Sequence, residues 1–198
     1  VAVGDFNNDA NLDLAVGNYS SATVSLFRGS ATGAFQLVTN LPVGPNPRSV
    51  AITDVTGDGS PDLVVLQSGD NTVSVFANNG NGTFQSRRDY GTGTSDAYQL
   101  TVLDLNADGR RDIIVPGYGN DVLSILFNNG IGGFSNVLSQ GSANGPICTA
   151  AEDFTGDGVL DLVITRYHSD AITVFSGNTV GPLAESPTGS LLRSGFGR

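Results

Sequence analysis

The sequence contains no methionine, no tryptophan and no lysine, so all nine of its basic residues are arginines. It has one cysteine and one histidine. A single cysteine excludes an internal disulfide, and the apolar segment around Cys148 favours a small buried side chain. So few basic residues argue against nucleic acid as a partner. They also argue against an enzyme, because a catalytic cleft needs a cluster of basic, tyrosine or paired acidic groups.

Long hydrophobic runs are missing as well. No apolar stretch approaches the roughly 20 residues that span a bilayer, and no signal peptide is visible. The chain opens on a strand-like segment without an initiator methionine, which suggests a processed product or a piece of a longer protein. We therefore expect no transmembrane segment in this chain.

Acidic loops of nine residues occur four times, each followed by an aliphatic strand. They occupy residues 5–13 (DFNNDANLD), 54–62 (DVTGDGSPD), 104–112 (DLNADGRRD) and 153–161 (DFTGDGVLD), and start 49, 50 and 49 residues apart. Such a period is typical of repeat architectures. The loops hold 12 of the 19 acidic residues, so most of the net charge of −10 is local to them.

Each repeat reads as four short strands. In the second repeat we expect strands over residues 49–53, 63–66 and 72–76, then a fourth that opens at Phe84. Four antiparallel strands per repeat predict the blade of an all-β propeller. The blades fall at about 1–48, 49–98, 99–147 and 148–198, and residues 184–198 lie outside the clear repeat pattern. The repeats form either a closed four-bladed ring or part of a larger, for example seven-bladed, propeller.

The loops carry oxygen donors at fixed places. Positions 1, 5 and 9 are always aspartate and position 3 is Asn or Thr, while position 7 varies, as expected if only its carbonyl is used. Oxygen-only ligands with several carboxylates favour Ca²⁺, and no neighbouring Cys or His supports zinc or copper. The sequence predicts up to four calcium ions, one per repeat. The predicted ligands are Asp5, Asn7, Asp9, Asn11, Asp13, Asp54, Thr56, Asp58, Ser60, Asp62, Asp104, Asn106, Asp108, Arg110, Asp112, Asp153, Thr155, Asp157, Val159 and Asp161.

The loops differ from an EF-hand, which needs Glu at position 12 and flanking helices. Here position 12 is Val or Ile inside the following strand. Position 6 is glycine in three copies, where a sharp turn favours positive φ. Ala10 replaces it in the first copy, at a cost of roughly 1–2 kcal/mol. We therefore expect the first calcium site to be the weakest.

These loops, their aliphatic strands and the Gly-x-Phe before the fourth strand resemble the FG-GAP and VCBS repeat proteins, which include the integrin α-chain propeller. The resemblance covers about residues 1–183. It implies an extracellular, secreted or cell-surface module for recognition or cell adhesion, with calcium away from the ligand face. Its partner is expected to be an extracellular protein or a glycan. A lectin and the propeller part of a polysaccharide lyase or hydrolase are the alternatives, and further repeats or self-association are also expected.

The strand order assigns the turns to two faces of the propeller. The calcium loops share one face with the turns between the third and fourth strands, and the turns after each second strand lie on the other. That second face carries Tyr19, Tyr118 and Tyr167, each six residues after the last loop aspartate, with Ser68 in the remaining place. Together with Arg166 and His168, these tyrosines form the predicted ligand site, since rings beside polar groups suit sugar or protein surfaces.

Overall fold

The computed structural model describes residues 1–142, 144–177, 184–185 and 191–192, without the side chains of residues 135–138, 184–185 and 191–192. Within these residues the chain is all-β, and its only helical turn is the 3₁₀ segment Tyr167–Ser169. No helix in the described part of the chain has the length and hydropathy needed to cross a bilayer. The predicted fold class is therefore confirmed at the level of secondary structure.

The strands form four antiparallel sheets, here called blades 1 to 4, and in each sheet the strands follow sequence order. Blade 1 contains β1 (Ala2–Gly4), β2 (Asp13–Asn18), β3 (Thr23–Gly29) and β4 (Phe35–Pro42). Blade 2 contains β5 (Pro47–Thr53), β6 (Asp62–Gln67), β7 (Thr72–Phe76) and β8 (Arg88–Gly91). Blade 3 contains β9 (Thr101–Leu103), β10 (Asp112–Gly117), β11 (Val122–Asn128) and β12 (Phe134–Gly141).

Blade 4 contains β13 (Pro146–Glu152), β14 (Asp161–Arg166) and β15 (Ala171–Ser176). Two short strands, β16 (Ala184–Glu185) and β17 (Leu191–Leu192), both pair with β15. They therefore take the place of a fourth strand, within the segment that lies outside the clear repeat pattern. The Pro-Leu pair that breaks the fourth Gly-x-Phe lies at residues 182–183, outside the described residues.

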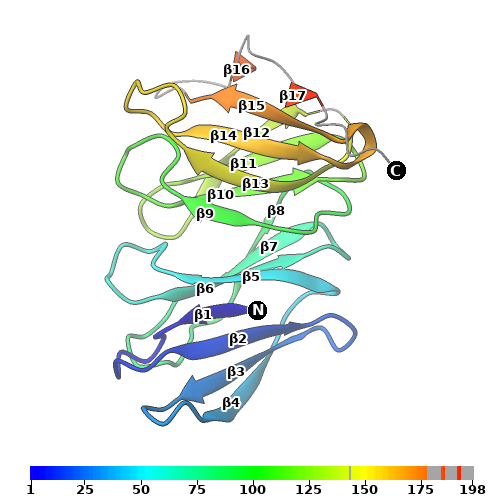
Figure 1. Ribbon diagram of the computed structural model, residues 1–198. Helices are drawn as coiled ribbons and strands as arrows, with labels where there is room; N and C mark the ends of the chain where they lie inside the picture. Colours follow the sequence, from blue (N-terminus) through cyan, green and yellow to red (C-terminus); the bar gives the residue numbers. More distant parts are fainter. Residues whose placement is uncertain (143, 178–183, 186–190, 193–198) are drawn as a thin grey trace.

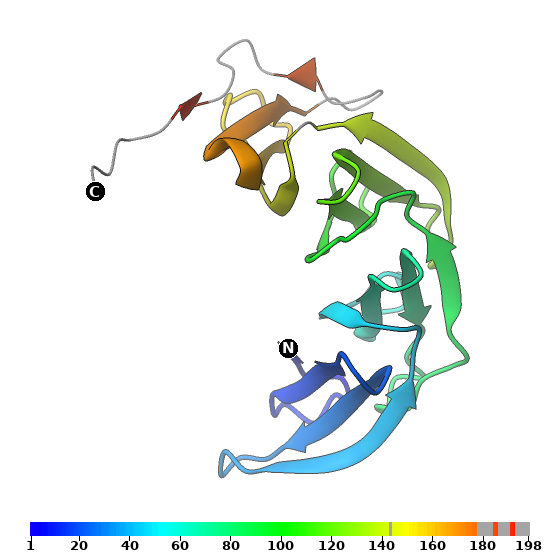
Figure 2. The same ribbon diagram turned by 90° about the vertical axis from the view of Figure 1, so that its right-hand side faces the viewer.

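The blades are arranged along an open arc (Figures 1 and 2). Figure 2 shows β1, β5, β9 and β13 on the concave side and β4, β8 and β12 on the convex side, with blades 1 and 4 at opposite ends. The described residues thus form an open arc and not a closed four-bladed ring.

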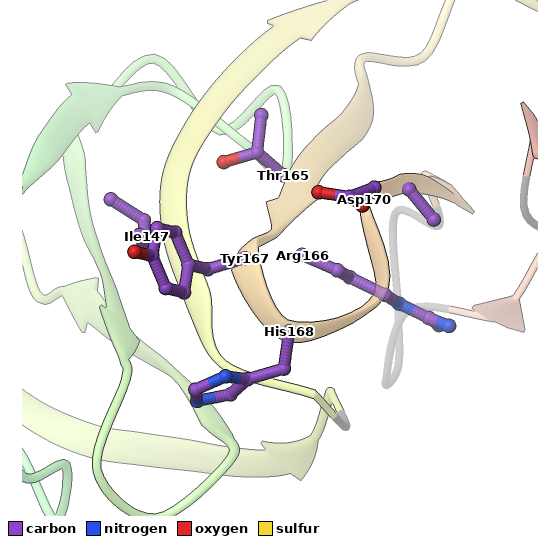
Figure 3. Close-up of a pocket in the computed structure, with 7 residues that line it drawn as sticks. Ile147, Thr165, Arg166, Tyr167, His168 and Asp170 are labelled. Carbon is purple, nitrogen blue, oxygen red and sulfur yellow. The ribbon is translucent and has the colours of Figure 1, made fainter. Parts of the chain in front are cut away.

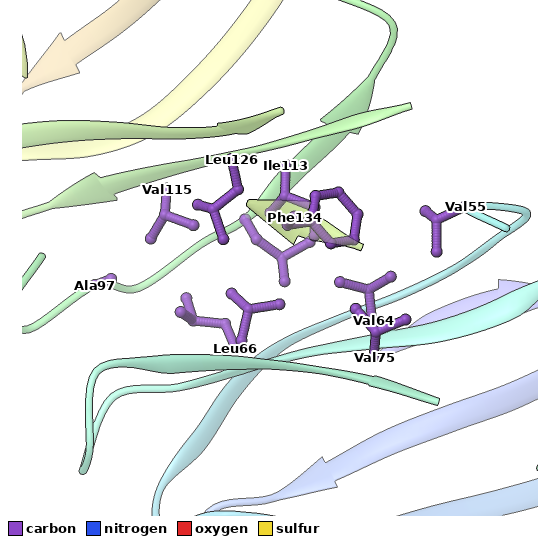
Figure 4. Packing of buried hydrophobic residues seen from close by; sticks show 11 residues of the cluster. Val55, Val64, Leu66, Val75, Ala97, Ile113, Val115, Leu126 and Phe134 are labelled. Atoms are coloured by element: carbon purple, nitrogen blue, oxygen red, sulfur yellow. The ribbon is translucent and has the colours of Figure 1, made fainter. Parts of the chain in front are cut away.

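Buried clusters lie between neighbouring blades, because successive side chains of a strand point to opposite faces. In β6, Leu63 and Val65 pack toward blade 1, whereas Val64 and Leu66 pack toward blade 3. Figure 4 shows the cluster between blades 2 and 3, where Val64 and Leu66 meet Ile113. A third cluster joins blades 3 and 4. Each internal blade is thus covered on both faces, as stacked repeats require.

The second residue of each acidic loop also depends on contact with a neighbouring blade for its burial. Phe6, Val55 and Leu105 are at most 3% exposed in the interface with the next blade. Phe154 holds the same place in blade 4 and is 55% exposed. The environment of this position is therefore set by the following blade.

Several local expectations differ from the structure. β5 starts at Pro47 rather than residue 49 and contains a bulge between Pro47 and Ser49. β8 starts at Arg88, since Phe84 forms only an isolated bridge and packs edge-on against Phe6. The expectation that Cys148 is buried is wrong, because it lies within the irregular stretch between Pro146 and Thr149 of the β13–β14 pairing and is exposed.

Candidate functional sites

The last aspartate of each loop is buried at the start of the second strand of its blade. These position-9 aspartates are Asp13, Asp62, Asp112 and Asp161, all 0% exposed. In blade 2, Asp62 Oδ2 accepts hydrogen bonds from the N–H groups of Val55 (2.9 Å) and Thr56 (3.0 Å). Its Oδ1 accepts one from Asn78 N–H at 2.8 Å. One carboxylate therefore ties the loop, β6 and the end of β7 together.

The other blades repeat this pattern. Both oxygens of each position-9 aspartate accept backbone N–H groups, one at loop position 2 and one 16 residues further along the chain. Neither of the two ion pairs in the described part of the chain includes these aspartates. They are thus buried carboxylates held by backbone donors, an arrangement that costs free energy unless every oxygen is satisfied.

Burial raises the pKa of two of these groups. It raises the pKa of Asp112 to about 6, against the smaller lowering by the Asn128 and Leu105 N–H groups, and nearby Asp108 and Asp104 raise it further. Burial likewise raises the pKa of Asp62. A cation in the adjacent loop would favour the charged form of both groups.

The first aspartate of each loop faces the opposite way, into the loop. In the first copy, Asp5 accepts hydrogen bonds from Asp9 N–H (3.1 Å) and Ala10 N–H (2.8 Å). Asn7 Oδ1 also accepts from Asp9 N–H, and Asp9 Oδ1 accepts from Asn11 N–H. The backbone and side-chain hydrogen bonds from Asn11 lower the pKa of Asp9. The loop is thus wrapped around its own oxygens and holds them in one place.

Wrapping of this kind needs a left-handed backbone twice in each loop. Position 6 has positive φ in all four copies, as predicted, and φ is 67° at Ala10. Position 4 is also left-handed in all four copies, which the sequence reasoning missed. The signal was its restriction to small or amide residues, namely Asn8, Gly57, Ala107 and Gly156.

These donors fit a hard cation by their chemistry. Positions 1, 3 and 5 offer carboxylate, amide or hydroxyl oxygens, and each carboxylate keeps lone pairs beyond those used by the N–H groups. In this structure, no three Asp, Glu, His or Cys side chains of the described residues converge closely enough to hold a metal. The position-9 aspartate, a predicted ligand, points both oxygens at the interior. The predicted calcium ligands stay a prediction.

The loops also contact the neighbouring blade. Asn78 Nδ2 donates to the carbonyl of Phe6 (2.7 Å), and Asn128 Nδ2 donates to that of Val55 (2.8 Å). Asn8 Nδ2 donates to Gly80 O in the turn before β8. The acidic loops and the turns after β7 and β11 therefore share one face of the arc, and each of the first two loops is hydrogen-bonded to the next blade.

Aromatic residues gather at the other ends of the strands. The rings of Tyr118 and Tyr167 are 5.8 Å apart, and His168 lies 5.0 Å from Tyr118. The structure thus brings together four of the five predicted ligand residues, since Arg166 lines one hollow with Tyr167 and His168. Tyr19 lies in blade 1, two blades from Tyr118 and three from Tyr167 and His168, and does not contact them directly.

Two residues missed by the sequence reasoning connect Tyr19 to this group. The Arg48 guanidinium lies 5.6 Å from the Tyr19 ring and 4.1 Å from the Tyr98 ring. Tyr98 in turn lies 5.6 Å from Tyr118. Arg48 and Tyr98 both precede the first aspartate of a loop by six residues, just as the predicted tyrosines follow the last one by six. The six-residue spacing is the same before and after an acidic loop, and this symmetry was the signal that could have identified Arg48 and Tyr98.

Together these side chains form a continuous band across the arc, here called the aromatic row: Tyr19, Arg48, Tyr98, Tyr118, Tyr167 and His168. At its blade 4 end lies an open hollow of about 640 Å³. Figure 3 shows Tyr167 beside Ile147 there, with Arg166 pointing away from His168. The hollow is lined by Ile147, Thr165, Arg166, Tyr167, His168, Asp170 and Ala171.

Comparison with known sequences gives one family match. Residues 5–65, 54–115 and 104–164 each match the FG-GAP-like repeat. Each match runs from one acidic loop to the strand after the next loop, so the matched unit is the repeat identified above. Among curated proteins, none matches this sequence.

Solved structures share the fold. A lectin from Agrocybe aegerita, described by its specific recognition of non-reducing terminal N-acetylglucosamine, is 23% identical with a TM-score of 0.65, over 92% of this chain and 50% of its own. Two structures of BBS1N in complex with ARL6DN are 10% and 12% identical, with TM-scores of 0.61 and 0.58. They are matched over 92% and 93% of this chain and 51% and 55% of theirs. The chain thus spans about half the length of these structures.

Proposed function

The chain belongs to the FG-GAP-like repeat family, and from this premise we propose that it is a non-catalytic, calcium-stabilised recognition module that binds glycans through the aromatic row. The observation that carries the proposal is the row itself, which crosses all four blades on the face opposite the acidic loops. One face then holds the fold together, and the other is available to a ligand.

Glycans suit this face better than other ligands for a chemical reason. Exposed tyrosine rings offer flat apolar surface, onto which the C–H faces of sugars stack, and hydroxyl groups for hydrogen bonds. The hollow adds Arg166, His168 and Asp170, whose donors and acceptors match sugar hydroxyls. The lectin with the same fold adds support, since its described ligand is a sugar. A protein ligand in an adhesion contact is the competing possibility.

Calcium has a structural role in this proposal. An ion bound by positions 1, 3 and 5 and the position 7 carbonyl would hold each loop closed over the buried position-9 aspartate. Four divalent ions would also reduce the net charge from −10 to −2. We place the protein outside the cell on the family resemblance, and therefore expect calcium affinities of about 10⁻⁴–10⁻³ M, the range of extracellular modules.

A glycan array read with calcium and with EDTA tests the proposal. Binding should be seen in calcium, and the variants Tyr118→Ala and Tyr167→Ala should each abolish it. Both variants should retain the calcium-dependent rise in melting temperature. Phe35→Ala is a matched control, because Phe35 is a half-exposed aromatic on the convex strand β4. Failure of the wild-type protein to bind any glycan would contradict the proposal.

A further inference from the structure

We infer that the aromatic row binds an extended glycan chain laid across several blades, rather than one terminal sugar in one pocket. This inference rests on the proposed glycan-binding function and specifies the shape of its ligand. It starts from the continuity of the row, which a site built for a single sugar does not require.

Continuity is visible in the distances. From Tyr19 to Tyr167 each member of the row lies 4.1–5.8 Å from the next, measured between ring centroids or from guanidinium carbon to ring centroid. The row begins in blade 1 and ends in blade 4 without a gap. A ligand that contacts both ends must therefore be a chain of several units.

The repeat explains how the row stays unbroken. Two positions of each repeat can contribute, one six residues before the loop and one six residues after it. In blade 2 the second position is Ser68, which has no ring to offer. Arg48, at the first position of the same blade, fills this place by lying between Tyr19 and Tyr98. Neither ion pair of the described residues includes Arg48, and its guanidinium lies over the Tyr19 and Tyr98 rings.

The exposure of the rings also favours a long ligand. Tyr19, Tyr98 and Tyr167 are 48%, 45% and 63% exposed, so large ring areas at both ends and in the middle face solvent. A site for one small ligand normally encloses most of its surface. Here the stacking area is instead spread along a line, and the polar groups of the hollow occupy only its blade 4 end.

Arg48 is a positioning residue in this scheme. Its guanidinium holds the Tyr19 and Tyr98 rings in line by cation–π contacts, a kind of interaction in which lysine does not replace arginine well. The Tyr118–Tyr167 end of the row does not depend on it. Substitution of Arg48 should therefore weaken long ligands selectively.

Calorimetry on the full chain with β-1,4-linked oligomers tests the inference. The probes are N-acetylglucosamine, glucose and xylose series, each from one to six units. For at least one series, the affinity should rise at least tenfold between the shortest and the longest member. Equal affinity for the monomer and the hexamer would overturn the inference while leaving the proposed function standing. Failure of all three series, together with an empty glycan array, would remove both.

Substitutions at the two ends separate one long site from one short site. With the hexamer, Tyr19→Ala and Tyr167→Ala should each lower the affinity, although they lie in blades 1 and 4. The dimer is too short to contact both ends of the row, so only one of these two substitutions should lower its affinity. Arg48→Gln should reduce hexamer binding more strongly than dimer binding, and Phe35→Ala should change neither. Unchanged hexamer affinity in Tyr19→Ala, with a wild-type melting temperature, would refute the extended site.

Discussion

Replacement of the buried Asp62 by asparagine tests whether the position-9 aspartate acts as a staple. By this we mean that its hydrogen bonds hold the loop and the neighbouring strands together without calcium. Asp62 Oδ1 and Oδ2 accept three backbone N–H groups at 2.8–3.0 Å in a fully buried site. Asparagine keeps one oxygen, so its amide N–H₂ must face at least one of these N–H groups. The shape of the side chain is otherwise almost unchanged, so packing contributes little to the result.

The expected loss in the free energy of unfolding follows from these hydrogen bonds. Hydrogen bonds to a charged group contribute about 1.5–3 kcal/mol, and an unsatisfied buried N–H costs about 1–3 kcal/mol. Burial raises the pKa of Asp62, so removal of the charge recovers part of this loss. We therefore expect Asp62→Asn to lower the free energy of unfolding by about 2–3 kcal/mol. In a chain of this size that corresponds to roughly 5–10 °C in melting temperature.

Asp58→Asn is the matched control, because it removes the same charge at position 5 of the same loop. Asp58 is exposed, and its Oδ1 accepts one hydrogen bond, from Ser60 N–H, which asparagine can also accept. In EDTA it should unfold like the wild type, but its calcium-dependent stabilisation should be smaller. Urea unfolding with and without calcium measures both effects. Equal stability of Asp62→Asn and the wild type in EDTA would refute the staple.

Three further predictions use differences within the chain. Phe6→Ala should destabilise the protein by about 3–5 kcal/mol, and Phe154→Ala at the equivalent exposed position by less than about 0.5 kcal/mol, both by urea unfolding. Ala10→Gly should stabilise the protein by about 1 kcal/mol, because glycine adopts the positive φ of 67° at this position without strain. A calcium titration should also show tighter binding at the first loop in this variant. EDTA should lower the melting temperature, and an unchanged value would argue against calcium in the loops.

The sequence predicts the fold well because its signals are local and repeated. The loop spacing identifies the blades, the alternation of apolar residues predicts the strands, and the strand order assigns the turns to two faces. The predictions fail where contacts between blades or irregular strand pairing determine the start of a strand or the exposure of a side chain. Phe84 packs against Phe6 instead of opening β8, and Cys148 is exposed beside an irregular stretch of β13. Neither effect is visible within one repeat.

The candidate sites were predictable to different extents. The oxygen donors of the loops follow from residue types, but the inward direction of position 9 depends on donors such as Asn78 N–H, 16 residues away. Tyr19, Tyr118 and Tyr167 were found by their common spacing. Arg48 and Tyr98 were not found, because only the turns that follow the second strand of each blade were considered. Their contact with each other depends on how neighbouring blades are placed along the arc.

The two faces of the arc are mechanically related through the second strand of each blade. β10 begins at Asp112, whose carboxylate is held by buried N–H groups, and ends at Gly117, directly before Tyr118. β14 likewise runs from Asp161 to Arg166, directly before Tyr167. Because a slip of one residue would turn every side chain of a strand to the other face, the staple at one end fixes which residues stand at the other. In the proposed function, the acidic loops would therefore support ligand binding by setting strand register, without contacting the ligand.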